Sequence, residues 1–196
     1  LAIQVAAKRY HPAAYWAVVV ATTTVGTTMS DYMDRTAGLG YVWSSAILFC
    51  TVLAILFAWR RVVGRIRFED ITTRREEIFY WVTILVSNTL GTALGDFVAT
   101  TLGMGFERGA LVFGALLALV AAAHSWQRRI PGAWLFWAAY VLTRPLGATL
   151  GDTLTKSHGE GGLALGRFVS SFAIIAAMAV AIVAMTRLSS NPRPAR

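Results

Sequence analysis

The chain has 196 residues, of which 56% are hydrophobic and only 14% are charged. Soluble domains carry charge on roughly a quarter of their residues, so this composition excludes an ordinary soluble domain and favours a membrane protein. The formal net charge of +8 would suit nucleic acid. The basic residues lie between apolar segments, however, so we interpret them as topology signals and expect no nucleic-acid partner. The single Cys50 excludes a disulfide framework.

The apolar segments predict transmembrane helices, each of which needs about 20 mostly apolar residues. Six segments qualify, at residues 13–33, 40–59, 78–100, 105–126, 133–155 and 163–186. They occupy most of the chain and leave no soluble domain. Residues 1–7, LAIQVAA, run from apolar into basic sequence as 52–61 does, and we interpret them as the end of a preceding transmembrane helix.

Three of the six spans carry one repeated pattern. A tryptophan lies 15 residues before an aspartate, a glycine lies five residues before that aspartate, and an aromatic residue precedes the tryptophan. The members are Trp16, Gly26 and Asp31; Trp81, Gly91 and Asp96; and Trp137, Gly147 and Asp152. Such coincident spacings indicate an internal repeat.

Each patterned span, here called a motif helix, is followed by a Gly-rich turn and a plain apolar span, here called a return helix. The sequence therefore predicts an all-α transmembrane fold of tandem two-helix hairpins, with six visible spans. We place repeat A at residues 8–67, repeat B at 68–129 and repeat C at 130–196.

The basic residues predict the orientation in the membrane. Two spans per repeat make the three motif helices parallel, and 13 of the 18 Lys and Arg residues fall at the tryptophan end. The positive-inside rule makes that end, and the C-terminus, cytoplasmic. Fifteen helical residues rise about 22 Å, which puts each aspartate in the outer third of the bilayer core. Trp16, Trp81 and Trp137 are then predicted to anchor the cytoplasmic interface.

The stretches YWAVVVATTTVGTTMSDYMDRT, FYWVTILVSNTLGTALGDF and FWAAYVLTRPLGATLGDTLTK carry a resemblance to a known family. The chain resembles a bacterial family of integral membrane proteins built from tandem two-span repeats of unknown function. Members usually have four repeats and hence eight spans. The resemblance implies that the first repeat is missing here, that the full length has eight spans, and that the location is the bacterial inner membrane. It implies no established activity.

Small and polar residues form two stripes on the motif helices. The small stripe contains Gly26, Gly91, Gly95, Gly147 and Gly151, whose spacing favours close helix packing. The polar stripe contains Thr27 and Asp31, then Asn88, Thr92 and Asp96, and in repeat C Arg144 and Asp152. Residues four apart share one helix face. An intramembrane charge is costly and by default marks a functional site, although a purely structural ion pair is the alternative.

The three aspartates have equivalent depths, so packed repeats would gather them into a ring of oxygens. Carboxylates held close together repel one another unless a cation or proton lies among them. Oxygen ligands suit Mg²⁺, Mn²⁺ or Ca²⁺, and Thr27, Thr92 and Asn88 would complete the shell. We therefore expect Asp31, Asp96 and Asp152 to be candidate ligands of a divalent cation, with a proton relay as the alternative.

Arg144 lies near mid-depth and directly precedes Pro145, which disturbs the helix. We favour a counter-ion to the aspartates over an anion-binding role. The three histidines are far apart, and no P-loop, HExxH, GxSxG or CxxC motif occurs, so we expect no catalytic residue and no enzyme.

The leading functional hypothesis is a transporter or channel-like protein for a small cation, either a divalent metal or a proton-coupled ion. One alternative is a structural or accessory membrane subunit whose polar stripe only assembles the bundle. Another is a transporter of an anionic solute that uses Arg144. The expected partners are the lipid bilayer, a small cation, and a second copy of the chain or a larger membrane complex.

Overall fold

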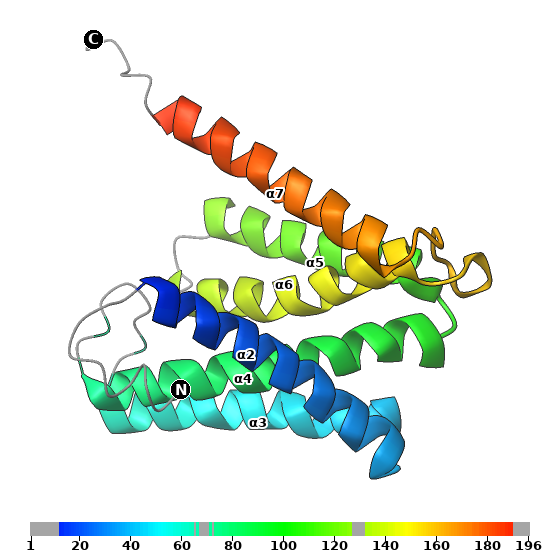
Figure 1. Ribbon diagram of the computed structural model, residues 1–196. Coiled ribbons are helices and arrows are strands. Elements are labelled where there is room, and N and C mark those ends of the chain that lie inside the picture. The colour runs from blue at the N-terminus through cyan, green and yellow to red at the C-terminus, as the bar shows by residue number, and fades with distance from the viewer. Residues whose placement is uncertain (1–11, 65, 67–70, 72, 127–131, 190–196) are drawn as a thin grey trace.

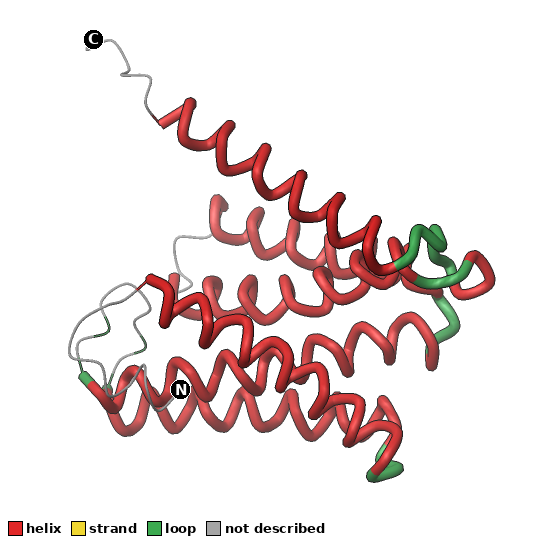
Figure 2. The backbone as a smooth tube through the Cα atoms, viewed as in Figure 1, coloured by secondary structure: helices red, strands yellow, loops and turns green. Residues whose placement is uncertain are grey.

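The computed structural model describes residues 12–64, 66, 71, 73–126 and 132–189 (Figure 1). Within these ranges the chain is all-helical and forms no strand (Figure 2), which confirms the predicted fold class. The long helices are α2 (Pro12–Asp31), α3 (Gly40–Val63), α4 (Arg74–Asp96), α5 (Gly105–Trp126), α6 (Gly132–Thr155) and α7 (Arg167–Ser189). Each covers one predicted span, although α7 begins four residues later than expected. Residues 1–7 lie outside the described part of the chain.

Three of the helices are long and apolar enough to cross a membrane within the part of the chain described. They are α3, α5 and the continuous helical stretch Arg74–Thr101, which contains α4. A membrane protein is therefore supported by length and composition.

Two π-helical turns follow the aspartates of repeats A and B. The first, η1 (Tyr32–Thr36), begins directly after Asp31, and the second, η2 (Phe97–Thr101), begins directly after Asp96. π-Helical turns are rare and occur frequently at functional sites. In repeat C, α6 instead continues to Thr155 and is followed by a short 3₁₀ turn, η3 (His158–Glu160).

Local sequence explains where the helices begin and end. Thr73 caps α4: its hydroxyl accepts the backbone N–H of Glu76, and the Glu76 carboxylate accepts the Thr73 backbone N–H at 3.0 Å. A glycine stands at the start of each return helix: Gly40 and Gly105 are the first residues of α3 and α5, and Gly166 directly precedes α7. Their φ angles are 70°, 76° and 76°. Glycine adopts this left-handed conformation without a steric penalty, so the outer turns can be tight.

The helices pack in an order that the sequence did not predict. The motif helices lie side by side as α2, α4 and α6, with α4 in the centre, while α3 packs along α4 and α5 packs along α6 (Figure 1). The two helices of one hairpin make few contacts along their lengths. The return helices α3 and α5 therefore pack against the motif helix of the following repeat. The last return helix, α7, diverges from the rest (Figure 1).

The tryptophan end of the bundle is closed by packed aromatic rings. Trp59 of α3 meets Trp137 of α6 edge to face at 5.6 Å and stacks on Phe79 of α4 at 6.0 Å. Trp81 and Trp137 are almost fully buried. Trp81 packs with Val18 of α2 and Tyr80, and Trp137 packs with Trp59 and Tyr80, so neither ring lies at the surface where the predicted interface anchors would be. The side chain of Trp16 lies outside the described side chains.

Candidate functional site

A polar cavity lies at the end of the bundle opposite the aromatic rings, with a volume of about 520 Å³. Residues from all three repeats line it: Thr27, Asp31, Arg35, Thr92, Asp96, Asp152, Thr155, Lys156, Gly166 and Arg167. The motif helices run in the same direction and carry their aspartates in the same register. Their packing side by side therefore brings the three carboxylates to one cavity.

The three aspartates differ in exposure. Asp96, on the central helix α4, is 9% exposed, whereas Asp31 and Asp152 are only partly buried. This difference follows from the packing, because α4 has a motif helix on each side and α2 and α6 have one each. Asp96 is thus the most enclosed carboxylate of the cavity.

Threonines lie one helical turn from the aspartates on the tryptophan side. The hydroxyls of Thr27 and Thr92 are 3.4 Å apart and join α2 to α4. Asn88 lies one turn further in and is buried against α2, but it does not line the cavity. Within the described part of the chain, neither polar atom of its amide has a hydrogen-bond partner. The predicted polar stripe is therefore split, with the threonines in the cavity and Asn88 in the helix interface.

Three basic residues share the cavity with the aspartates. Arg35 lies 3.7 Å from the Asp31 carboxylate, and Lys156 and Arg167 line the same space. None of the three belongs to the predicted polar stripe. A signal was available, since Arg35 and Lys156 each follow the repeat aspartate by four residues and so share its helix face.

Asp34 does not form the exposed ion pair with Arg35 that its position suggests. Its side chain is buried and accepts a hydrogen bond from the Ser30 hydroxyl at 3.1 Å. Arg35 instead forms an ion pair with Asp31, which lies one helical turn before it. The pairing fixes one cation at the edge of the aspartate group.

Arg144 is not the counter-ion of the aspartates in this structure. Its guanidinium donates to the Tyr140 hydroxyl and lies over the Tyr140 ring, 4.3 Å from its centre. Tyr140 precedes Arg144 by one helical turn, toward the tryptophan end, so the charge points away from Asp152. Arg144 is absent from the cavity lining. The cations that do face the aspartates are Arg35, Lys156 and Arg167.

The carboxylates do not form a direct metal site. Among the described residues, no group of three or more His, Cys, Asp or Glu side chains is close enough to hold a metal ion. Asp31, Asp96 and Asp152 surround a roomy space and do not converge on one point. The expected first coordination shell for Mg²⁺, Mn²⁺ or Ca²⁺ is therefore not formed.

The small stripe makes close helix contacts at three of its five predicted positions. A Cβ on Gly26 would lie 2.7 Å from the Asn88 Cβ, and one on Gly91 would overlap the Cβ of Arg144. Gly95 faces Thr149 at 3.4 Å. Among the described residues, no atom lies within 4 Å of the Cβ position of Gly147 or Gly151.

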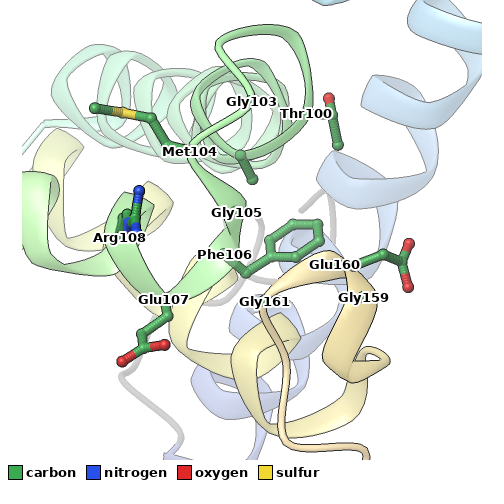
Figure 3. Close-up of a pocket in the computed structure, with 11 residues that line it drawn as sticks. Thr100, Gly103, Met104, Gly105, Phe106, Glu107, Arg108, Gly159, Glu160 and Gly161 are labelled. Atoms are coloured by element: carbon green, nitrogen blue, oxygen red, sulfur yellow. The ribbon is translucent and has the colours of Figure 1, made fainter.

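A second hollow of about 510 Å³ lies between the outer turns of repeats B and C (Figure 3). Phe106 projects into it, whereas the charged groups of Glu107 and Arg108 point in different directions (Figure 3). The pKa of Glu160 is held below its ordinary value by the Ser157 hydroxyl, which donates to its carboxylate at 2.8 Å. Polar groups do not converge here, so this hollow is a weaker candidate than the aspartate cavity.

Parallel, in-register helical repeats around a polar cavity define a multi-span membrane protein with an internal repeat. The chain belongs to the family described as Repeat of Unknown Function (DUF347), which matches residues 14–64, 79–129 and 135–191. One match falls in each of repeats A, B and C, which confirms the resemblance seen in the sequence. No curated protein and no solved structure matches the chain.

Proposed function

We propose that this membrane protein conducts or transports a small cation through the cavity where the repeat aspartates meet. The observation that carries the proposal is that one aspartate from each of three repeats lines a single cavity. A charged side chain within a membrane span costs several kcal/mol, roughly 2.5–3.5 on insertion scales. A purely structural bundle has no need to incur that cost three times at one place.

The cargo would keep part of its hydration shell or would be a proton. The cavity is wide, and its carboxylates do not form a chelating group among the described residues. Three aspartates and three basic residues line it, so its formal charge sums to zero when empty. An entering cation would compete with Arg35 for Asp31, and the hydroxyls of Thr27 and Thr92 would supply further oxygen contacts.

We further propose that the tryptophan end and the C-terminus face the cytoplasm and that the membrane is the bacterial inner membrane. The bias of Lys and Arg toward the tryptophan end supports this orientation. The aspartate cavity then lies near the outer surface. The packed rings of Trp59, Trp81 and Trp137 lie between it and the cytoplasm.

The experiment is a flux measurement in liposomes that contain the purified chain and a trapped pH-sensitive dye. Opposed gradients of protons and of Na⁺, K⁺ or Mg²⁺ are imposed in turn. Asp96→Asn keeps the side-chain shape and removes the charge, so we expect it to reduce the flux at least tenfold. The matched control is Glu107→Gln, an exposed carboxylate outside the cavity, which should leave the flux unchanged. Absence of flux from the unmodified chain with every gradient would favour a structural subunit instead.

A second candidate function is transport of an anionic or zwitterionic solute, favoured by Arg35, Lys156 and Arg167 in the cavity. Lys156→Gln separates the two. A cation carrier should keep or increase its flux when this positive charge is removed, because the cation loses a competitor. A carrier of anionic solutes should lose most of its flux.

A further inference from the structure

The interface between repeats A and B contains a buried amide whose polar atoms are unpaired. Asn88 of α4 is 6% exposed, and its Cβ lies against the backbone of α2 at Gly26. Among the described residues, neither the oxygen nor the nitrogen of this amide forms a hydrogen bond. Buried polar groups in native proteins are nearly always bonded to protein or to ordered water, so the Asn88 amide needs a partner. Both polar atoms are unpaired, so this need is the same whichever way the amide is turned.

The neighbouring buried hydroxyls of α4 have partners within their own helix. Thr83, Ser87 and Thr89 donate to backbone carbonyl oxygens three or four residues earlier, at 2.7, 3.0 and 3.0–3.1 Å respectively. The Asn88 amide makes no such bond in the described structure. It is enclosed between α2 and α4 of the same chain, so a partner that reaches it must be small, as water is.

Asn88 lies on the face of α4 that leads to the aspartate cavity. Thr92 and Asp96, which line that cavity, follow Asn88 at steps of four residues, each of which rises about 6 Å. Between the cavity and Asn88, the hydroxyls of Thr27 and Thr92 are 3.4 Å apart. Hydroxyl pairs usually lie about 2.7–2.8 Å apart, so this contact is long and weak. The polar face of α4 therefore continues for about 12 Å inward from Asp96.

Repeat C has a polar residue at the equivalent position. Arg144 lies eight residues before its repeat aspartate, as Asn88 does, and its Cβ packs on Gly91 of α4. Its Nε is also buried without a partner in the described structure, whereas the end of its guanidinium donates to Tyr140. Asn88 and Gly91 are three residues apart and so are neighbours on the surface of α4. Unpaired polar atoms from two repeats therefore occur at one depth.

The polar face ends one helical turn beyond Asn88. Ile84 and Trp81 continue the same face toward the tryptophan end, and they are 3% and 2% exposed. Both belong to a buried apolar cluster with Val18 of α2. Asn88 thus marks the boundary between the polar groups that lead inward from the cavity and the apolar packing near the cytoplasmic end.

We propose that Asn88 holds ordered water at the inner end of a hydrated path that leads from the aspartate cavity between α2 and α4, and that the transported cation reaches this depth. The amide supplies one acceptor oxygen and two donor hydrogens, and a buried water typically makes about three hydrogen bonds. An uncharged amide can contact the hydration water of a cation without holding the ion as tightly as a carboxylate would. The part that concerns the cation rests on the proposed function, whereas the water site does not.

The water site is tested by deuterium exchange of a single thiol. Asn88→Cys is made in a Cys50→Ala background, reconstituted in lipid and transferred to D₂O, and infrared absorption follows the conversion of S–H to S–D. The control is Leu90→Cys on the same helix, because Leu90 is 0% exposed and belongs to an apolar cluster. We expect the thiol at position 88 to exchange about tenfold faster, or more, than the thiol at position 90. Equal rates would overturn the water site.

The role in transport is tested with Asn88→Leu and Asn88→Ser in the liposome flux measurement. Leucine has a similar size and shape but no polar atoms, so it should reduce the flux about tenfold and should not raise the unfolding temperature. Serine keeps a polar group and should retain most of the flux. Circular dichroism checks that both variants remain helical.

The outcomes separate this inference from the proposed function. A normal flux together with a higher unfolding temperature in Asn88→Leu would overturn the inference, since the amide would then be dry and only destabilising. Rapid thiol exchange at position 88 in a chain whose unmodified form shows no flux would confirm the water site and overturn the transport of a cation past it.

Discussion

Individual residues show where sequence reasoning succeeds and where it fails. Helical periodicity correctly puts Thr27 on the face of Asp31 and Thr92 on that of Asp96, since both are local relations within one helix. The environment of Trp137 depends on Trp59, which lies 78 positions earlier in the chain. No local pattern contains that contact. Along its helix face, Arg144 has Tyr140 one turn before it and Asp152 two turns after it, and in the structure its side chain lies on Tyr140.

The glycines of the small stripe allow a test at the residue scale. A methyl group at Gly91 would overlap Arg144, so Gly91→Ala should destabilise the fold by about 1–3 kcal/mol through overpacking. Gly147→Ala, at the equivalent but open position of α6, should be neutral or stabilising by up to about 1 kcal/mol from helix propensity. Thermal unfolding in detergent compares the two variants. Equal effects would show that the two positions are packed alike.

At the scale of single elements, the ends of helices were more predictable than their irregularities. Thr73 followed three residues later by Glu76 is a sequence pattern typical of a helix start, and in the structure these two residues form the capping box of α4. The π-helical turns after Asp31 and Asp96 were not predicted. Their sequences, YMDRT and FVATT, share an aromatic first residue and a final threonine but little else, and an ordinary α-helix would accept both. The extra residue in each turn is selected by the surrounding packing.

The cap of α4 can be tested directly. Thr73→Ala removes the oxygen that accepts the Glu76 backbone N–H, which typically costs about 1 kcal/mol of stability. Thr73→Ser keeps a hydroxyl at the same place and should remain close to the unmodified chain. The measurement is denaturant unfolding followed by helical circular dichroism. A loss of similar size in both variants would indicate that the methyl group, and not the cap, is responsible.

For the whole molecule, the sequence predicted which helices are paired along the chain but not which are packed together. The pattern of tryptophan, glycine and aspartate defined three units, and all three occur in the structure. The return helices α3 and α5 nevertheless pack on the motif helix of the next unit, and Leu48 of α3 and Phe113 of α5 are buried. Chain connectivity limits which helices are near each other, whereas packing depends on where Gly26 and Gly91 allow two backbones to approach. The cavity is formed by the same close contacts between helices. Which basic residues line it therefore depends on packing that the sequence did not predict.

The orientation of the molecule is testable with single cysteines in a Cys50→Ala background. Ser157→Cys lies in the turn after α6, and Ser125→Cys lies near the tryptophan end of α5. In intact cells, an impermeant thiol reagent should label Ser157→Cys at once and Ser125→Cys only after permeabilisation. The opposite pattern would reverse the proposed topology and place the aspartate cavity near the cytoplasm.

The junction between repeats has a consequence for how such a chain can evolve. Every repeat contributes two spans, and repeat A contacts repeat B through Gly26 as repeat B contacts repeat C through Gly91. A duplicated or deleted hairpin would therefore leave the orientation of all others intact and would rebuild the same junction at the point of change. Loss of a single span would invert everything that follows it. The two-span hairpin, and not the single helix, is accordingly the smallest unit that can be copied without a change of topology. Because each hairpin contacts mainly its neighbours, the stability of the molecule is nearly a sum of contributions from hairpins and from the contacts between them.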